Sequence, residues 1–250
     1  MKPTPFLACA LALIAVAGCN SKQGDAATNA AVDAKPVPPP KGGDWSTVVS
    51  ATPEGGFVMG NPNARLKLIE YGSLTCPHCR EFDEKGVPLL ISNYVETGLV
   101  SWEFRNYVRD AFDLTASLIA RCNGAQSFFP LSRAFYKDQD VWVDKIRNTP
   151  QDQIEQLQNL PPNQQFVELA KVADFQNWAA ARGVPVAKTN QCLSDENSVN
   201  KLVQMTSDAT TQFPDFPGTP TFILNGHMLE KTATWEQLEP QLRATLGERG

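Results

Sequence analysis

The residues whose types and spacing most plainly permit chemistry are the two cysteines of Cys76-Pro77-His78-Cys79. A Cys-x-x-Cys pair can be half of a zinc site, a haem attachment site or a redox-active dithiol. Haem attachment requires a histidine directly after the second cysteine, and the chain has Arg80 there. Zinc needs two further ligands at matching spacing, but Cys122, Cys192 and His227 are distant and dispersed. We therefore predict a redox pair, with no bound metal or other cofactor.

The position of this pair in the chain indicates how it would react. An apolar run, Arg65 to Tyr71, predicts a buried strand just before it, and Pro77 suits the first position of a helix. Cys76 would then lie at the helix N-terminus, where unpaired N–H groups and the helix dipole favour a thiolate. Cys79, three residues on, would lie on the same face of the helix. We expect Cys76 to be the nucleophile and Cys79 the resolving thiol.

His78, between the two cysteines, is the predicted source of further thiolate stabilisation. Lowering a thiol pKa from about 8.5 to about 3.5, as in the strongest known oxidants, requires about 7 kcal/mol. A helix terminus contributes roughly 0.3–2 kcal/mol. Specific donors must therefore contribute the rest, and His78 is within reach. Its alternative role is a solvent-exposed helix residue.

The composition is that of a globular protein with a hydrophobic core. The chain has 250 residues, 42% of them hydrophobic and 20% charged. Its formal net charge is −5, and basic and acidic residues are mixed along the chain. Because a nucleic-acid-binding surface requires a basic patch or stripe, we expect no nucleic-acid partner.

The N-terminal part predicts export and a membrane anchor. Residues 1–18 read as a signal peptide, and Val16-Ala17-Gly18-Cys19 resembles the lipobox of bacterial lipoproteins, in which Cys19 would carry lipid. The alternative is an ordinary cleaved signal. Asn20, where an aspartate would retain a lipoprotein at the inner membrane, favours the outer membrane. Residues 19–44 are rich in Ala, Asp, Pro and Gly and predict a disordered tether. We expect a periplasmic protein held to a membrane by lipid.

The folded part begins near Asp44 and predicts an α/β protein with a helical insertion. The order of elements suggests a βαβ unit with a parallel pair of strands. It consists of the strand Arg65–Tyr71, a helix over Arg80–Glu96 kinked at Pro88, and a strand over Leu99–Val108. Five helices are predicted next: Leu114–Cys122, Ser127–Lys137, Asp152–Leu157, Gln165–Arg182 and Asn197–Thr211. A hairpin follows, with Thr221–Leu224 and His227–Glu230 flanking an Asn-Gly turn, and a helix over Thr234–Leu246 closes the chain. We predict that residues 45–110 and 215–250 together form the sheet domain and that residues 111–214 form the helical insertion.

Two motifs together resemble the DsbA-like branch of the thioredoxin superfamily, over roughly Asp44 to Gly250. They are Thr75-Cys76-Pro77-His78-Cys79 and Gly218-Thr219-Pro220-Thr221-Phe222. The resemblance implies a thioredoxin fold with an inserted all-helical subdomain that caps the sheet and helps to shape a substrate groove.

The resemblance also implies roles for three residues outside the dithiol. Pro220 matches a cis-proline lying against the dithiol, with the backbone of Thr219 free to pair with an extended substrate. Glu70 lies six positions before the nucleophile, where the family has a buried acid that exchanges protons with the resolving thiol, here Cys79. The alternatives are a trans proline that starts a strand and a partly exposed strand glutamate.

The resemblance implies an oxidase that donates the Cys76–Cys79 disulfide to reduced exported proteins and is recycled by a membrane redox partner. Thr219 departs from this expectation, because oxidases of the family resemble a Val-Pro pattern and isomerases a Thr-Pro one. A reductase or isomerase is therefore an alternative, as is a tethered peptide-binding chaperone. Isomerases of the superfamily are usually dimers with a separate dimerisation domain. Residues 20–44 are too short and polar to form one, so we expect a monomer.

Cys122 and Cys192 are the remaining pair in the predicted mature protein. In an oxidising compartment we expect them to form a structural disulfide, as in some DsbA-like proteins. Two buried free thiols are the alternative.

Overall fold

A computed structural model of the chain describes residue 1, residues 35–40 and residues 43–247. Most of the predicted signal peptide and the predicted lipidation site, Cys19, lie outside these residues. No helix in the described ranges combines the length and apolar character needed to cross a membrane. At the described end of the predicted tether, the backbone N–H of Val37 donates to the carbonyl of Thr97 (2.8 Å), and the indole of Trp45 donates to the carbonyl of Val37 (2.8 Å). The chain is thus attached to the folded part at Val37.

Six strands form one sheet in the order β1-β2-β4-β3-β5-β6. They are β1 (Val49–Ala51), β2 (Phe57–Gly60), β3 (Leu66–Gly72), β4 (Val100–Asn106), β5 (Thr221–Leu224) and β6 (His227–Met228). β3 and β4 run parallel, and the other neighbouring pairs run antiparallel. This confirms the predicted parallel pair and the hairpin. β1 and β2 were not predicted, because they are short and separated by Pro and Gly residues.

The connection from β3 to β4 contains the helix that begins at the dithiol. α1 (Pro77–Lys85) is followed by α2 (Val87–Leu90) and by a π-helical turn, η2 (Ile91–Val95). The prediction of a kink at Pro88 was two residues off, since the break lies at Gly86, whose N–H closes α1 on the carbonyl of Phe82. A proline ring clashes with the carbonyl four residues earlier, so the helix must break before the proline rather than at it.

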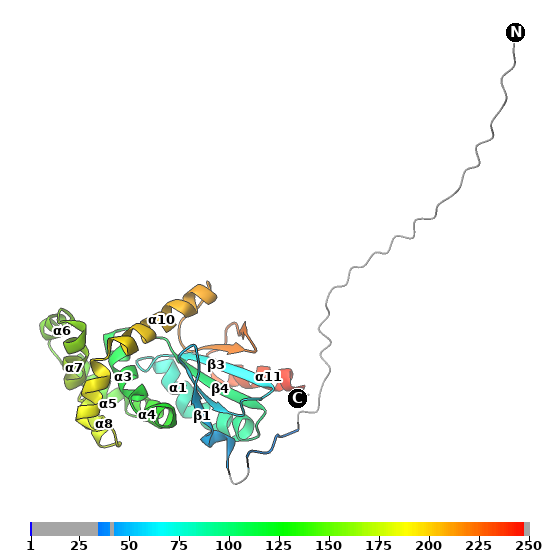
Figure 1. Cartoon of the computed structure of the whole chain (residues 1–250), viewed down its shortest axis with the longest axis horizontal. Helices are drawn as coiled ribbons and strands as arrows, with labels where there is room; N and C mark the ends of the chain where they lie inside the picture. Colours follow the sequence, from blue (N-terminus) through cyan, green and yellow to red (C-terminus); the bar gives the residue numbers. More distant parts are fainter. Residues whose placement is uncertain (2–34, 41–42, 248–250) are drawn as a thin grey trace. The chain divides into compact units, whose positions relative to one another are not determined.

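Eight helices separate β4 from β5 in the chain. They are α3 (Ala111–Arg121), α4 (Ala125–Lys137), α5 (Gln139–Arg147), α6 (Gln151–Gln158), α7 (Pro162–Val172), α8 (Phe175–Ala180), α9 (Val186–Leu193) and α10 (Glu196–Gln212). Helices α3 to α8 gather beside the strands, and α10 returns to contact β4 (Figure 1). This arrangement confirms the thioredoxin-like sheet with a helical insertion.

Three details of the insertion differ from the prediction. The single helix predicted over Gln165–Arg182 was wrong, because Asp174 takes a left-handed conformation (φ 59°) between α7 and α8. α5 and α9 were not predicted. Both are short, with eight or nine residues, so their apolar periodicity is weak.

The two faces of β3 point to different surroundings, because successive side chains of a strand alternate. Leu66 and Leu68 lie in the main core, which also contains Phe82 from α1 and Leu238 from the last helix, α11 (Trp235–Leu246). Tyr71 belongs to a smaller cluster on the other face. Glu70 shares the face of Leu66 and Leu68, which places its carboxyl group among buried residues on the α1 side of the sheet.

Candidate active site

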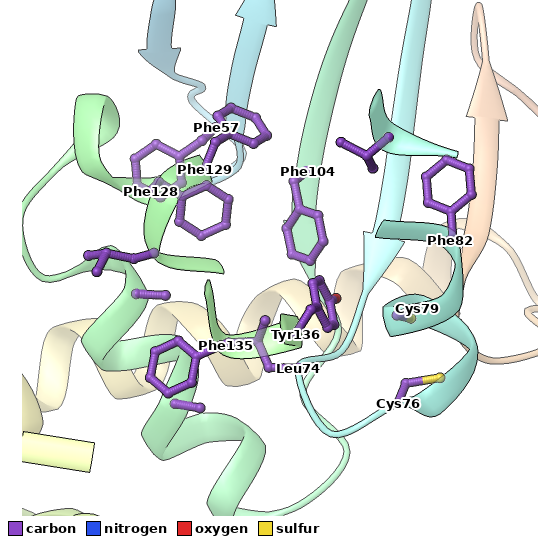
Figure 2. Close-up of a cluster of buried hydrophobic side chains, with 14 of the residues drawn as sticks. Phe57, Leu74, Cys76, Cys79, Phe82, Phe104, Phe128, Phe129, Phe135 and Tyr136 are labelled. Atoms are coloured by element: carbon purple, nitrogen blue, oxygen red, sulfur yellow. The ribbon is translucent and has the colours of Figure 1, made fainter. Parts of the chain in front are cut away.

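Cys76 and Cys79 lie at the first turn of α1, directly after the loop that follows β3 (Figure 2). Cys76 is the N-cap residue, with an extended backbone (φ −83°, ψ 122°), and Pro77 occupies the first helical position. Both thiols are free, and their residues are 3% and 0% exposed. Cys79 therefore lies deeper in the protein, one helical turn after Cys76.

The surroundings of Cys76 lower the pKa of its thiol from 9.0 to about 5. The largest cause is a hydrogen bond from the thiol of Cys79, which outweighs the opposing effect of burial. The Thr219 side chain and the backbone N–H groups of Cys79 and His78 lower the pKa further. These N–H groups belong to the first turn of the helix, where they have no partner within the helix itself.

Cys79 has the opposite shift, and its pKa lies well above 9.0. Burial is the main cause, and the hydrogen bond to Cys76 and the negative charges of Cys76 and Glu70 act in the same direction. The two thiols of one motif are therefore differentiated: Cys76 ionises readily, whereas Cys79 stays protonated and donates a hydrogen bond to Cys76.

Glu70 is 1% exposed, and its pKa is raised well above 4.5. Burial is the first cause, the charge of Asp83 the second, and Cys76 adds to them. The indole N–H of Trp102 donates to Oε2 of Glu70 at 3.1 Å and opposes the shift. Gly72 leaves room for this carboxyl group, since a Cβ there would lie 3.2 Å from Oε1 of Glu70. Glu70 is thus a buried acid that interacts electrostatically with both thiols.

Thr219 lies against Cys76, although the two residues are 143 positions apart in the chain, and Pro220 follows it. The peptide bond between Thr219 and Pro220 is cis. The thiol of Cys76 donates to the carbonyl oxygen of Thr219 at 3.2 Å. The hydroxyl of Thr219 is buried and has no hydrogen-bond partner among the described residues. Both motifs of the sequence therefore meet at the sulfur of Cys76.

His78 contributes a backbone N–H to this site, and its side chain is exposed. The role predicted for the imidazole in stabilising the Cys76 thiolate stays a prediction.

Several polar residues of the helical insertion hold the loop Ser73–Thr75, and the sequence did not reveal them. Asp113 accepts hydrogen bonds from the Ser73 hydroxyl (2.6 Å) and from the N–H of Leu74 (2.9 Å). The hydroxyl of Tyr136 donates to the carbonyl of Ser73 at 3.2 Å. Burial raises the pKa of Asp113 to about 7, although these donors oppose the shift. Only the Asp110–Asp113 spacing at a helix start could have indicated a capped α3 beside this loop.

Asp83 is a second buried acid near the dithiol. It lies on α1, one turn beyond Cys79. Burial raises its pKa to about 6, against the effect of Arg133 on α4, whose Nε lies 3.4 Å from Oδ1 of Asp83. Residues four apart on a helix are neighbours, so Asp83 and Cys79 share a face. The insertion therefore adds a positive charge near the buried acids below the dithiol.

Cys122 and Cys192 form a disulfide, with 5.6 Å between their Cα atoms. It joins the end of α3 to α9 within the helical insertion. In the described ranges, no group of three or more His, Cys, Asp or Glu side chains could hold a metal ion.

Comparisons with known proteins agree with this architecture. A family model described as Thioredoxin matches residues 52–244. A Rickettsia bellii protein named "Putative protein-disulfide oxidoreductase" is 29% identical over 178 residues, which are 71% of this chain and 60% of the relative. A Rickettsia prowazekii relative with the same description is 28% identical over 177 residues, 70% of this chain and 56% of the relative. The chain thus spans less than two thirds of the length of these relatives.

Two solved structures show the same fold. The protein-disulfide isomerase of Novosphingobium aromaticivorans is 35% identical, with a TM-score of 0.72, over 76% of this chain and 96% of that chain. The α-DsbA1 of Wolbachia pipientis is 23% identical, with a TM-score of 0.63, over 80% of this chain and 94% of that chain. With a family match over residues 52–244, a parallel β3–α1–β4 unit and a helical insertion, the chain belongs to the thioredoxin family and has the DsbA-like architecture.

Proposed function

We propose that the protein is a thiol–disulfide oxidoreductase that donates a Cys76–Cys79 disulfide to reduced exported proteins. The observation that carries the proposal is the difference between the two thiols: the pKa of Cys76 is lowered to about 5, whereas that of Cys79 is raised. A stabilised Cys76 thiolate favours the reduced enzyme, and a dithiol that favours its reduced form is an oxidant. The names of the Rickettsia and Novosphingobium relatives support the same class of activity.

The reaction consists of two exchanges. A substrate thiolate attacks the Cys76 sulfur, the Cys76–Cys79 bond breaks, and Cys79 leaves with the electron pair and takes a proton, for which buried Glu70 is the candidate donor. A second substrate thiolate then attacks the substrate sulfur bonded to Cys76, and Cys76 leaves as a thiolate. The substrate is oxidised by two electrons, and the enzyme dithiol is reduced by two electrons. Thr219 and Pro220 would lie alongside the bound substrate backbone.

The proposed setting is the periplasm, with lipid on Cys19 as the membrane anchor and the outer membrane as its site. A membrane redox partner would reoxidise the dithiol after each turnover. Mass spectrometry of the mature N-terminus tests the anchor: we expect an acylated cysteine at position 19. An unmodified N-terminus at another residue would remove the anchor from the proposal and leave the exchange chemistry intact.

The reduction potential of the dithiol against glutathione tests the direction of exchange. We expect a value near −120 mV, as for strongly oxidising dithiols, and a value near −270 mV would identify a reductase instead. Cys76→Ala should abolish oxidation of a reduced protein substrate, with Cys122→Ala/Cys192→Ala as the control that retains it. Unchanged activity in Cys76→Ala would contradict the proposed function altogether and favour a peptide-binding chaperone.

Disulfide isomerisation is the second candidate. The similarity to the Novosphingobium protein, named a protein-disulfide isomerase, and the Thr219-Pro220 pair favour it. Refolding of a scrambled disulfide-containing substrate in the absence of other oxidants separates the two activities. An isomerase restores native activity from the scrambled form, whereas an oxidase acts only on the reduced form.

A further inference from the structure

Gln139 on α5 connects the helical insertion to the backbone on either side of Thr75. It is the first residue of α5 and is 3% exposed. Its side-chain Nε2 donates to the carbonyl oxygen of Leu74 at 2.7 Å and to that of Cys76 at 3.1 Å. Both partners are acceptors, so the nitrogen of the amide, with its two hydrogens, must face them.

The carbonyl group of Cys76 has a second role in the first turn of α1. It accepts a hydrogen bond from the N–H of Arg80 at 3.1 Å, the first bond of the helix. The orientation of this N-cap residue therefore decides whether its sulfur faces the N–H groups of His78 and Cys79. We propose that Gln139 is a positioning residue of the dithiol, because its amide holds the Leu74 and Cys76 carbonyls and thereby aims the Cys76 sulfur at the N–H groups of α1.

Gln139 is itself held in place by the residue before it. The carboxylate of Asp138, at the junction of α4 and α5, accepts hydrogen bonds from the indole of Trp178 (2.8 Å) and the guanidinium of Arg182 (2.6 Å). On its other side, Asp140 forms an ion pair with Arg80 of α1. These contacts fix the start of α5, and with it Gln139, relative to α8 and α1.

Several charged or titratable groups from the neighbouring elements surround this part of the chain, and any change in the ionisation of Cys76 must be interpreted with them present. They are Glu70 on β3; His78, Cys79, Arg80 and Asp83 on α1; Asp110 and Asp113 at the start of α3; Arg133 and Tyr136 on α4; and Asp140 on α5. Gln139 is uncharged, so its removal changes none of these charges. An altered Cys76 pKa in an uncharged Gln139 variant would therefore report a change in geometry.

The test measures alkylation of Cys76 in the reduced full-length protein at a series of pH values. Peptide mass spectrometry reads Cys76 separately from the other thiols. Gln139→Met removes both donors at similar volume, and we expect the Cys76 pKa to rise by roughly one unit, a tenfold loss of thiolate stabilisation. Gln139→Glu places a carboxylate against two carbonyl oxygens and should raise the Cys76 pKa further, through its negative charge as well as through the altered geometry. The equilibrium with glutathione should shift by the same factor towards the disulfide form.

Gln176→Met is the matched control. Gln176 is a buried glutamine of the same insertion, on α8, and donates to Thr189 and Asn190 at 3.3 Å and 2.6 Å. None of its described hydrogen bonds reaches the loop Ser73–Thr75 or Cys76. Gln176→Met should therefore lower the unfolding temperature without changing the Cys76 pKa.

The inference deepens the proposed function, but it can fail independently. If Gln139→Met keeps the wild-type Cys76 pKa and loses only thermal stability, like Gln176→Met, Gln139 is structural and the inference is wrong. That outcome would leave the oxidoreductase proposal standing. Conversely, loss of the proposed activity class would not change the expected alkylation profile.

Discussion

The sulfur of Cys76 lies 3.2 Å from the carbonyl oxygen of Thr219, the residue before the cis-proline. This carbonyl accepts a hydrogen bond from the thiol of Cys76 and so favours the neutral form of Cys76. The Thr219 hydroxyl acts in the opposite direction and lowers the pKa of Cys76. It has no hydrogen-bond partner in the described part of the chain, so it can turn its proton towards a thiolate. Thr219 can therefore form a hydrogen bond with Cys76 in either protonation state: its carbonyl with the thiol, and its hydroxyl with the thiolate.

The reactivity of Cys76 should follow the pKa of about 5 rather than the ordinary thiol value of 9.0. We expect its alkylation rate to reach half its maximum near pH 5 and to stay level from pH 7 to 9. Because the folded-state pKa is below the unfolded one, the ionised thiol stabilises the reduced protein fully above about pH 9, and this stabilisation is lost as the pH falls through 5. The reduced wild-type protein should therefore lose stability relative to Cys76→Ser as the pH falls from about 9 through 5. A midpoint near pH 9 would contradict the prediction.

Glu70→Gln should slow exchange and stabilise the fold. Burial raises the pKa of Glu70, so its ionised form is disfavoured in the folded state, and a neutral glutamine avoids that cost. The stability gain should be absent below about pH 4.5 and grow as the pH rises above it. Steps that move the Cys79 proton should slow by roughly 10²-fold. Thermal unfolding and single-turnover kinetics measure the two effects, with the exposed Glu96→Gln as control. Unchanged kinetics would exclude Glu70 as a proton carrier.

The Cys122–Cys192 disulfide should contribute to stability without affecting the dithiol. It closes a loop with a sequence separation of 70 residues. On the chain-entropy model, replacing both cysteines with alanine should lower the free energy of unfolding by about 4 kcal/mol. Urea unfolding of the variant and wild type, with the Cys76–Cys79 pair in the same redox state, measures this difference. The glutathione equilibrium of the dithiol should remain unchanged, and a shifted equilibrium would show that the two pairs are coupled.

Gly72→Ala should destabilise the sheet beneath the dithiol. A Cβ at this position would lie 2.5 Å from two ring atoms of Phe104 and 3.2 Å from the carboxyl oxygen of Glu70. Overpacking of this kind costs about 1–3 kcal/mol. We also expect a changed alkylation profile for Cys79, because the displaced Glu70 charge contributes to its raised pKa. Wild-type unfolding and a wild-type Cys79 profile would together contradict the described packing.

The parts of the fold predicted well were those with a local signal. β3 and β4 are apolar runs bounded by turn residues, and Pro77 marks the start of α1 because a proline needs no N–H at that position. The Asn225-Gly226 turn indicated the β5–β6 hairpin in the same way, and both residues have positive φ angles. β1, β2, α5 and α9 were missed, since elements of three to nine residues carry little periodicity.

The amino-acid sequence by itself determined the dithiol, its place at a strand-to-helix junction and the second motif at Thr219-Pro220, because these depend on residue identity and short spacing. Only the tertiary structure decided what surrounds the sulfur atoms. Cys79 and Glu70 become buried only in the folded chain. The hydroxyl of Thr219 and the amide of Gln139 are brought to Cys76 from elements far apart in the chain. Their effect on a thiol pKa depends on distance, burial and orientation, and those quantities exist only once the chain has folded.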